Sequence, residues 1–305
     1  MSCFINNNAL PTRFGVSPSC VVLPHGSWPS VFDFLVQRFA HIPKATWQQR
    51  FEEGHVLNAQ GNTLSLVSTY VAGARVYYYR ELPNEPEFPV SETVLFQDAH
   101  LVVVDKPHFM PVTPAGRYVQ RSLLVRLKQR LKIDTLSPIH RIDRETAGLV
   151  LFSVNPDERD AYHALFRSQQ VHKVYEAVAP VVTDVPMPCV RKSRMSADAL
   201  FFKSCEVSGE PNSETHIRLL RTLGTLGLYE LKPRTGQRHQ LRIHMMAMGL
   251  PIVGDQFYPN VLRGPNEEDD HTQTLQLLAK RVTFTDPITG QARVFESQQR
   301  LQIQR

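Results

Sequence analysis

The chain has 305 residues, 42% of them hydrophobic, and a formal net charge of +5, which suits one large domain, or a large and a small one, with a sizeable core. No apolar run approaches the roughly 20 residues of a membrane span, and no signal peptide is visible at the N-terminus. The four cysteines are far apart and form no CxxC pair, which argues against a zinc ribbon or a disulfide framework and predicts a reducing compartment, the cytoplasm.

The predicted elements of the first part of the chain form a small module. Residues 1–24 show no sustained period and are predicted to be a loose arm. Ser30 can cap an amphipathic helix, and a second helix is expected from about Lys44 to Glu53. Short strands with glycine turns follow, up to the proline-rich stretch LPNEPEFPVSE, which is typical of a linker. The pattern predicts a module over residues 25–85 and a larger domain over residues 86–305.

The larger domain mixes strands and helices. Strands are predicted at HLVVVDKP, LVLFS and KVYEAVAPVV, and a hairpin at HIRLLRTL and LGLYELKP. RSLLVRLKQRLKI predicts a basic amphipathic helix, and HQLRIHMMAMG predicts a helix that ends at Gly249. Because the helices do not alternate regularly with the strands, the pattern favours an α+β fold over a doubly wound sheet.

Basic residues gather in three places. Seven lie between Arg121 and Arg144, four lie between Lys232 and Met248, and three more lie between Arg191 and Arg194. Acidic residues are concentrated elsewhere, notably over residues 267–270. Any one cluster could be a solvated face, but three clusters beside apolar strands favour a polyanionic partner whose phosphates they bind.

The segment SPIHRIDRETAGLVLFS contains the best candidate for catalysis. The chain has no GxSxG, GxGxxG, phosphate-loop or HExxH pattern, and its cysteines have no obvious base partner. No metal site is therefore expected, and the candidate nucleophile is a carboxylate. Asp143 precedes a buried strand, and Arg141 and Arg144 flank it and would hold it ionised. From spacing alone, a turn aspartate with a local hydrogen bond stays the alternative.

The segment HRIDRETAGLVLFS resembles the HRLDxxTSGLLL signature of the RluA family of pseudouridine synthases. LVVVDKPHFMPVTPAG, VHKVYEAVAP and LKPRTGQRHQLRIHMMAMGLPIVGDQFYP are similar to three further motifs of that family, in the same order. The resemblance covers about Glu92 to Phe295. The N-terminal module is similar, less specifically, to a small RNA-binding module named after a ribosomal protein.

The resemblance implies an α+β fold with a central mixed, largely antiparallel sheet, flanking helices and loops, and a small N-terminal α/β RNA-binding module. It implies an enzyme that isomerises uridines in ribosomal or transfer RNA by breaking and re-forming the glycosidic bond. Because nothing is oxidised and no group is transferred, we expect neither cofactor nor metal, and a monomer is the default expectation. Asp143 matches the catalytic aspartate, Tyr175 the tyrosine that stacks on the base, and Arg242 the basic partner of the aspartate. The residues assigned to RNA or substrate binding are Lys106, His140, Arg141, Lys173, Arg238, His239 and Gln240.

For some of these residues we expect a more specific role. Arg141 matches the arginine that fills the space left by the flipped uridine, and His140 is expected to shape the turn. Where the family has TGR, this chain has Gln237 followed by Arg238, so we expect Arg238 to contact an RNA phosphate or the surroundings of Asp143. The basic helix is also expected to bind phosphates around the site.

Two other classes of protein stay open. A non-catalytic RNA-binding protein would have lost Asp143, Tyr175 or Arg242, and all three are present. A carboxylate-based glycosidase needs a second carboxylic acid at a defined distance from the first. The residues available for that role are Glu145, Glu176 and Asp255.

Overall fold

A computed structural model describes residues 10–80, 82, 84–182, 184–264 and 267–304 and separates the chain into two units. The first extends to Glu85 and the second begins at Pro86, inside the proline-rich stretch of residues 82–92. Among the described residues, no helix combines the length and the apolar character that crossing a membrane requires.

The N-terminal unit packs two helices against a three-stranded sheet in the order β1-β3-β2. Its elements are β1 (Ser19–Val22), α1 (Val31–Arg38), α2 (Lys44–Glu52), β2 (Val56–Leu57) and β3 (Arg75–Tyr78). Both predicted helices are confirmed, and the Ser30 hydroxyl accepts a hydrogen bond from the Asp33 amide as a helix cap. Trp47 lies fully buried in the core.

The prediction of a loose arm over residues 1–24 is wrong for β1. Ser19 lies opposite Tyr78 of β3 in an antiparallel pair. A four-residue strand whose partner lies far along the chain carries no local period, so the sequence pattern missed it. The first nine residues of the predicted arm lie outside the described residues.

The second unit is built on a mixed sheet, which has eleven strands in the described part of the chain. The main order is β10-β9-β11-β12-β8-β13-β7-β5-β4, with β14 on β13 and β6 on β7. All pairs are antiparallel except β13 with β7. The strands are β4 (Thr93–Gln97), β5 (Leu101–Lys106), β6 (Ser137–Pro138), β7 (Ala147–Ser153), β8 (His172–Pro180), β9 (Cys189–Ala197), β10 (Ser204–Val207), β11 (Ser213–Leu223), β12 (Leu226–Pro233), β13 (Leu277–Thr285) and β14 (Ala292–Glu296). The predicted α+β fold with a largely antiparallel mixed sheet is confirmed.

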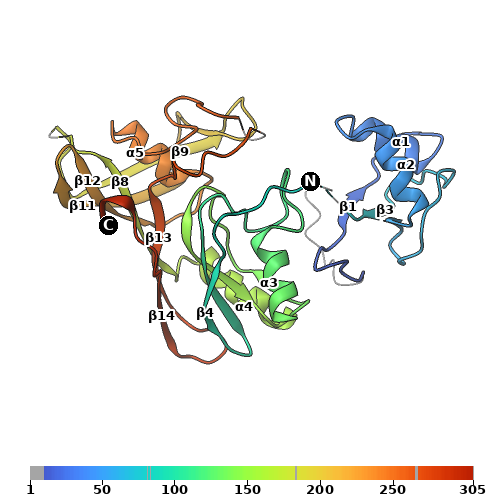
Figure 1. Cartoon of the computed structure of the whole chain (residues 1–305), viewed down its shortest axis with the longest axis horizontal. Coiled ribbons are helices and arrows are strands. Elements are labelled where there is room, and N and C mark those ends of the chain that lie inside the picture. Colours follow the sequence, from blue (N-terminus) through green and yellow to red (C-terminus); the bar gives the residue numbers. More distant parts are fainter. Residues whose placement is uncertain (1–9, 81, 83, 183, 265–266, 305) are drawn as a thin grey trace. The chain divides into compact units, whose positions relative to one another are not determined.

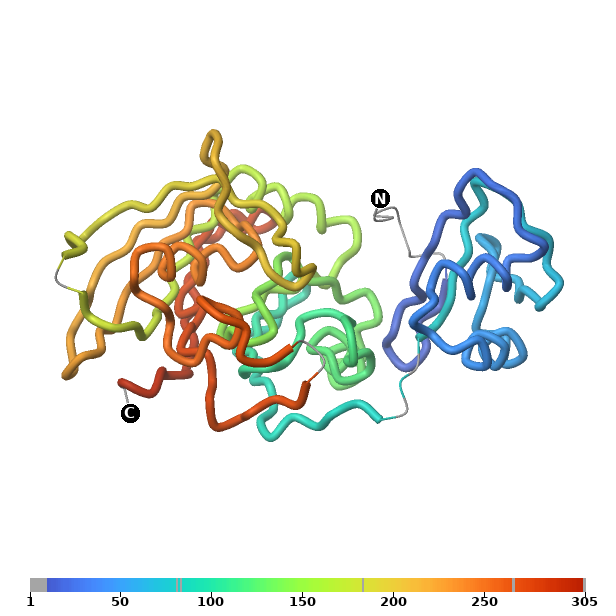
Figure 2. The backbone as a smooth tube through the Cα atoms, turned by 90° about the horizontal axis from the view of Figure 1, so that it is seen from above, coloured from blue at the N-terminus to red at the C-terminus, as the bar shows by residue number. Residues whose placement is uncertain are grey.

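Helices cover the sheet where its strands are apolar on both faces. They are α3 (Leu123–Leu131), α4 (Arg159–Arg167), α5 (Gln240–Ala247), and two short 3-10 turns, Pro156–Glu158 and Gln302–Gln304. Val102 and Val104 of β5 pack with α3, whereas Leu101 and Val103 pack with α4. This explains the unbroken apolar run of β5. Figures 1 and 2 show α3 and α4 toward one end of the large unit and α5 toward the other.

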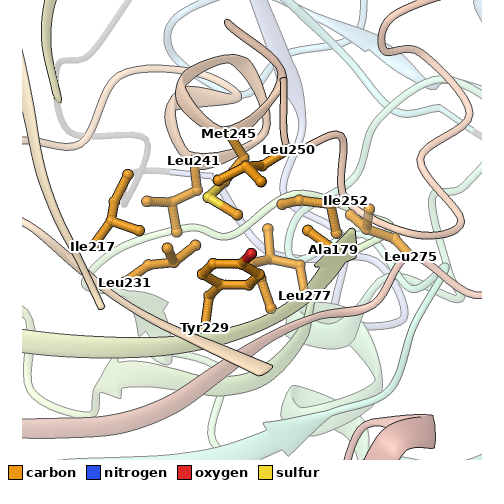
Figure 3. Close-up of a cluster of buried hydrophobic side chains, with 11 residues drawn as sticks. Ala179, Ile217, Tyr229, Leu231, Leu241, Met245, Leu250, Ile252, Leu275 and Leu277 are labelled. Atoms are coloured by element: carbon orange, nitrogen blue, oxygen red, sulfur yellow. The ribbon is translucent and has the colours of Figure 1, made fainter. Parts of the chain in front are cut away.

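Helix α5 is held against the centre of the sheet by a buried cluster of side chains (Figure 3). Leu241 and Met245 of α5 pack with Tyr229 and Leu231 of β12 and with Leu277 of β13. Every residue of α5 from Gln240 to Met245 is buried. The helix is therefore a rigid base for the polar side chains that it contributes to the site.

Gly148 allows β13 to join β7 directly after the turn that carries Asp143. Its φ is +109°, and a Cβ there would lie 2.3 Å from the Ala279 carbonyl oxygen. We expect Gly148→Ala to lower the free energy of unfolding by about 2–5 kcal/mol, because backbone strain and overpacking add. Gly224→Ala is the control, since Gly224 also has a positive φ but faces open space, and we expect it to lose about 1 kcal/mol. Urea unfolding with equal losses for both variants would contradict this.

Candidate active site

Segments from distant parts of the second unit surround one cavity of 580 Å³. The turn before β7 and the turn before α5 both contribute to its wall. The first turn is closed by a hydrogen bond from the Thr146 amide to the Asp143 carbonyl, 3.1 Å. The lining residues are Pro111, Val112, Thr113, Ala115, Gly116, Arg117, Tyr118, Arg141–Glu145, Phe201, Phe202, Gly236–His239 and Phe257.

The Asp143 carboxylate faces this cavity with two cationic or polar neighbours. Its side chain is 25% exposed, with Arg242 Nη1 at 3.6 Å from Oδ2 and His239 Nε2 at 3.9 Å from Oδ1. Burial alone would raise the pKa of Asp143, but His239, Arg242 and the Lys106 ammonium together hold that pKa below its ordinary value. Asp143 is therefore ionised at neutral pH.

The arginines next to Asp143 in sequence are not what holds it ionised, so that prediction is wrong. Arg144 turns away, and its guanidinium donates to Asp269 Oδ2 at 2.6 Å and to Glu145 Oε1 at 3.0 Å. Arg141 is exposed at the cavity wall. Consecutive side chains in a turn point in different directions, so the cation that faces Asp143 comes from α5 instead.

Arg242 is a fixed cation beneath the cavity. Its side chain has no exposed surface, and its Nε and Nη2 donate to both Asp255 carboxylate oxygens at 2.8 and 2.6 Å. Burial would lower the pKa of Arg242, but the Asp255 hydrogen bonds and the nearby carboxylates raise it above its ordinary value. Among the residues that the structure describes, Nη1 has no hydrogen-bond partner, and Asp143 and Glu145 lie 3.6 and 3.5 Å from it. Arg242 Nη1 therefore faces the Asp143 and Glu145 carboxylates, where it can orient the Asp143 carboxylate.

Tyr175 lies on β8 between Leu231 of β12 and Ala279 of β13. Burial, and then the Asp143 charge, raise the pKa of its phenol well above the ordinary value. The hydroxyl is therefore protonated at neutral pH. In the described part of the chain, Tyr175 packs against the α5 core cluster and is not among the residues that line the cavity.

The turn before α5 places three predicted RNA-binding residues in different environments. His239 has a positive φ of 58°, is buried, and its Nδ1 lies 2.9 Å from the Tyr258 hydroxyl. Gln240 is also buried, and its side-chain oxygen accepts from the Gln237 amide at 3.0 Å. Arg238 is exposed and lines the cavity. The turn thus presents Arg238 outward, while Gln240 maintains the turn.

Two further predicted RNA-binding residues, Lys106 and Lys173, support the turns that carry the site. Lys106 has no exposed surface, and its Nζ donates to the Arg144 carbonyl at 3.1 Å; burial lowers its pKa to about 7. Lys173 Nζ donates to the Thr235 carbonyl at 3.2 Å. In this structure both lysines bind backbone at the two turns that carry the site.

His140 shapes the segment before the turn, as expected. Its ring stacks on Phe166 with centroids 4.9 Å apart, and its Nε2 accepts a hydrogen bond from the Leu151 amide at 3.2 Å. Burial, and next the Lys173 charge, lower the pKa of His140 to about 3. The imidazole is neutral at physiological pH and acts as an acceptor.

Three carboxylates form ion pairs that the sequence pattern did not predict. Asp255 and Glu145 are almost fully buried and pair with Arg242, so they are not free for the second carboxylic acid of a glycosidase. Asp269 belongs to the acidic run of residues 267–270, which is distant in sequence from the turn of Asp143 but contacts it in the fold. Its carboxylate accepts from Arg144 and from Arg117, the latter at 2.9 Å.

Helix α3 presents less positive charge than its sequence indicates. Arg126 and Arg130 pair with the buried Glu92 carboxylate at 2.8 and 3.2 Å. Lys128 is itself buried. Because Glu92 neutralises part of this charge and Lys128 is buried, the helix presents fewer unpaired cations for phosphates than its sequence indicates, although Arg130 is exposed.

The arrangement of these side chains indicates a class of enzyme. An ionised carboxylate at the cavity wall has a buried, fixed cation beside it and a protonated tyrosine near it, and exposed arginines and aromatic rings line the cavity. In the described residues, no group of three or more His, Cys, Asp or Glu could hold a metal ion. Such a site suits carboxylate chemistry on a base or sugar of an anionic polymer.

Comparisons with known proteins identify the family. The family model described as RNA pseudouridylate synthase matches residues 100–247. The chain is 30% identical to the uncharacterized RNA pseudouridine synthase slr1592 of Synechocystis sp. over 75% of this chain and 79% of that protein. It is 29% identical to the dual-specificity RNA pseudouridine synthase RluA of Haemophilus influenzae, over 70% of this chain and 95% of that one.

A solved structure agrees with these relatives. Human RNA pseudouridylate synthase domain containing 4 superposes with a TM-score of 0.53 at 26% identity, over 68% of this chain and 88% of that chain. The chain belongs to the RluA family of RNA pseudouridine synthases. It is an isomerase, and neither the non-catalytic RNA-binding protein nor the glycosidase is favoured.

Proposed function

We propose that Asp143 is the carboxylate that drives the isomerisation of uridine. The reaction breaks the bond between the sugar and nitrogen 1 of uracil, rotates the base, and joins carbon 5 to the sugar. The hydrogen of carbon 5 leaves as a proton and nitrogen 1 takes up a proton, so the mass is unchanged. The observation that carries the proposal is an ionised Asp143 that faces the cavity with the buried Arg242 beside it.

Arg242 and Tyr175 have supporting roles in this proposal. Arg242 orients the carboxylate and keeps it ionised, an electrostatic interaction that is strong in a site shielded from water. Tyr175 carries a neutral hydroxyl near Asp143, which can stack or donate but cannot act as a base at neutral pH.

The substrate in this proposal is an unpaired uridine of structured RNA, ribosomal or transfer. A uridine in a loop leaves its stack at a lower cost than one in a helix. Arg141 takes the vacated space, and Arg238 contacts a phosphate; both are exposed and line the cavity. Action in the cytoplasm and a monomeric state stay predictions.

Mapping of pseudouridine in total RNA tests this function. We expect a strain without the gene to lack one or a few pseudouridines, and the purified protein to restore them in that RNA. Digestion and mass analysis must then show an unchanged nucleoside mass with a new base linkage. Release of free uracil would contradict the proposal, since it indicates a glycosidase.

The N-terminal unit is proposed to add RNA affinity and not chemistry, because it is a separate unit with its own core. Removing residues 1–85 should raise the KM for RNA by about tenfold or more and leave the single-turnover rate at saturating protein within about twofold. The measurement is tritium release from 5-tritiated uridine, with circular dichroism to verify folding. A truncated protein with normal RNA binding but a small fraction of the rate would contradict this proposal.

A further inference from the structure

The turn between β9 and β10 places an exposed aromatic ring at the active-site cavity. Phe201 is 77% exposed, yet it lines the same cavity as Asp143. A single exposed apolar side chain is ordinary on a protein surface. The position of Phe201 in the cavity wall is what points to a ligand.

The ring is presented by an ordered turn. Phe202, the next residue, packs against Phe257 at 5.2 Å between centroids and joins a buried cluster. The Lys203 amide donates to the Leu200 carbonyl at 2.8 Å, and Arg238 Nη1 donates to the Phe201 carbonyl at 2.7 Å. Because Phe202 anchors the turn in the core, Phe201 stays outside it, and little further ordering is needed for the ring to bind a flat partner.

The charges around Phe201 indicate what that partner is. Arg141 and Arg238 line the same cavity and are exposed. Cations for phosphates beside an aromatic face for a base are the means by which proteins bind unpaired nucleotides. We propose that Phe201 is a stacking platform for an unpaired base adjacent to the target uridine. This proposal rests on the RNA substrate proposed above.

Three substitutions of Phe201 test the proposal in the full-length protein. The probe is 5-tritiated total RNA from a strain lacking the gene, used in single-turnover tritium release at increasing protein concentration. We expect Phe201→Ala to raise the half-saturating protein concentration by about 5- to 150-fold, the range that loss of one stacked base predicts, without changing the plateau rate. Phe201→Trp keeps a π face and should stay within about twofold of the unaltered protein, whereas Phe201→Leu should resemble Phe201→Ala.

The control is Leu223→Ala, which removes another exposed apolar side chain, 64% exposed, at the tip of the β11–β12 hairpin. It should change neither quantity. A half-saturating concentration within twofold of normal for Phe201→Ala, or for Phe201→Leu if the alanine variant does not fold, would overturn the stacking role. Absence of tritium release by the unaltered protein would instead overturn the proposed function.

Discussion

Asp143→Asn should form no detectable pseudouridine, a loss of more than about 10⁴-fold in the single-turnover rate. The amide keeps the shape of the carboxylate, but it can neither attack nor accept a proton at a useful rate. If Asp143 were only a turn residue, asparagine would serve nearly as well. The measurement is tritium release from 5-tritiated uridine in total RNA of a strain lacking the gene.

RNA binding separates this loss from misfolding. Filter binding of the same preparation should be unchanged or tighter, because one negative charge leaves a cavity lined by exposed arginines. The control is Asp160→Asn, an aspartate in an exposed pair with Arg167, for which we expect normal activity because surface pairs contribute little. Substantial tritium release by a folded Asp143→Asn protein would remove Asp143 from the catalytic role.

The same substitution has a pH-dependent effect on stability. The pKa of Asp143 is lower in the folded protein than its ordinary value of 3.8, so its ionised form stabilises the fold. That contribution is complete above the pKa of the unfolded chain and is lost as pH falls through the lower folded value. The stability difference between the unaltered protein and Asp143→Asn should therefore be larger at pH 7 than below pH 3, by urea unfolding.

Arg242→Gln should abolish activity and also destabilise the protein by about 3–5 kcal/mol, because it leaves the Asp255 carboxylate buried without its cation. Urea unfolding and tritium release measure the two effects. Arg242→Lys keeps the charge but not the two-pronged hydrogen bond, so it should fold better and still lose most of its activity.

The pH dependence of the Arg242→Lys variant shows how Arg242 acts. Arg242 is one of the groups that lower the pKa of Asp143. A more distant lysine charge should let this pKa rise, and the acid limb of the rate profile should move to higher pH. An acid limb and a rate equal to those of the unaltered protein would show that Arg242 only supports the fold.

The sequence alone determined the family and the kind of fold. The α1, α2 and α5 helices and the β11–β12 hairpin follow from local periodicity and caps, and the structure has all of them. The motif spacing also indicated Asp143, Tyr175 and Arg242, which the fold brings together even though α5 lies almost a hundred residues beyond the turn of Asp143. Such signals are readable because each depends on residue types within one short segment.

Only the tertiary structure decided which charges face one another. Arg144 turned out to bind Asp269, more than a hundred residues away, and the cation facing Asp143 comes from α5. Lys106, a charged residue typical of surfaces, is fully buried under the turn, while Phe201, an apolar residue typical of cores, is exposed at the cavity. The physical reason is that ion pairing and burial depend on the distance between side chains in space, and the order of residues along the chain does not determine that distance until the sheet is assembled.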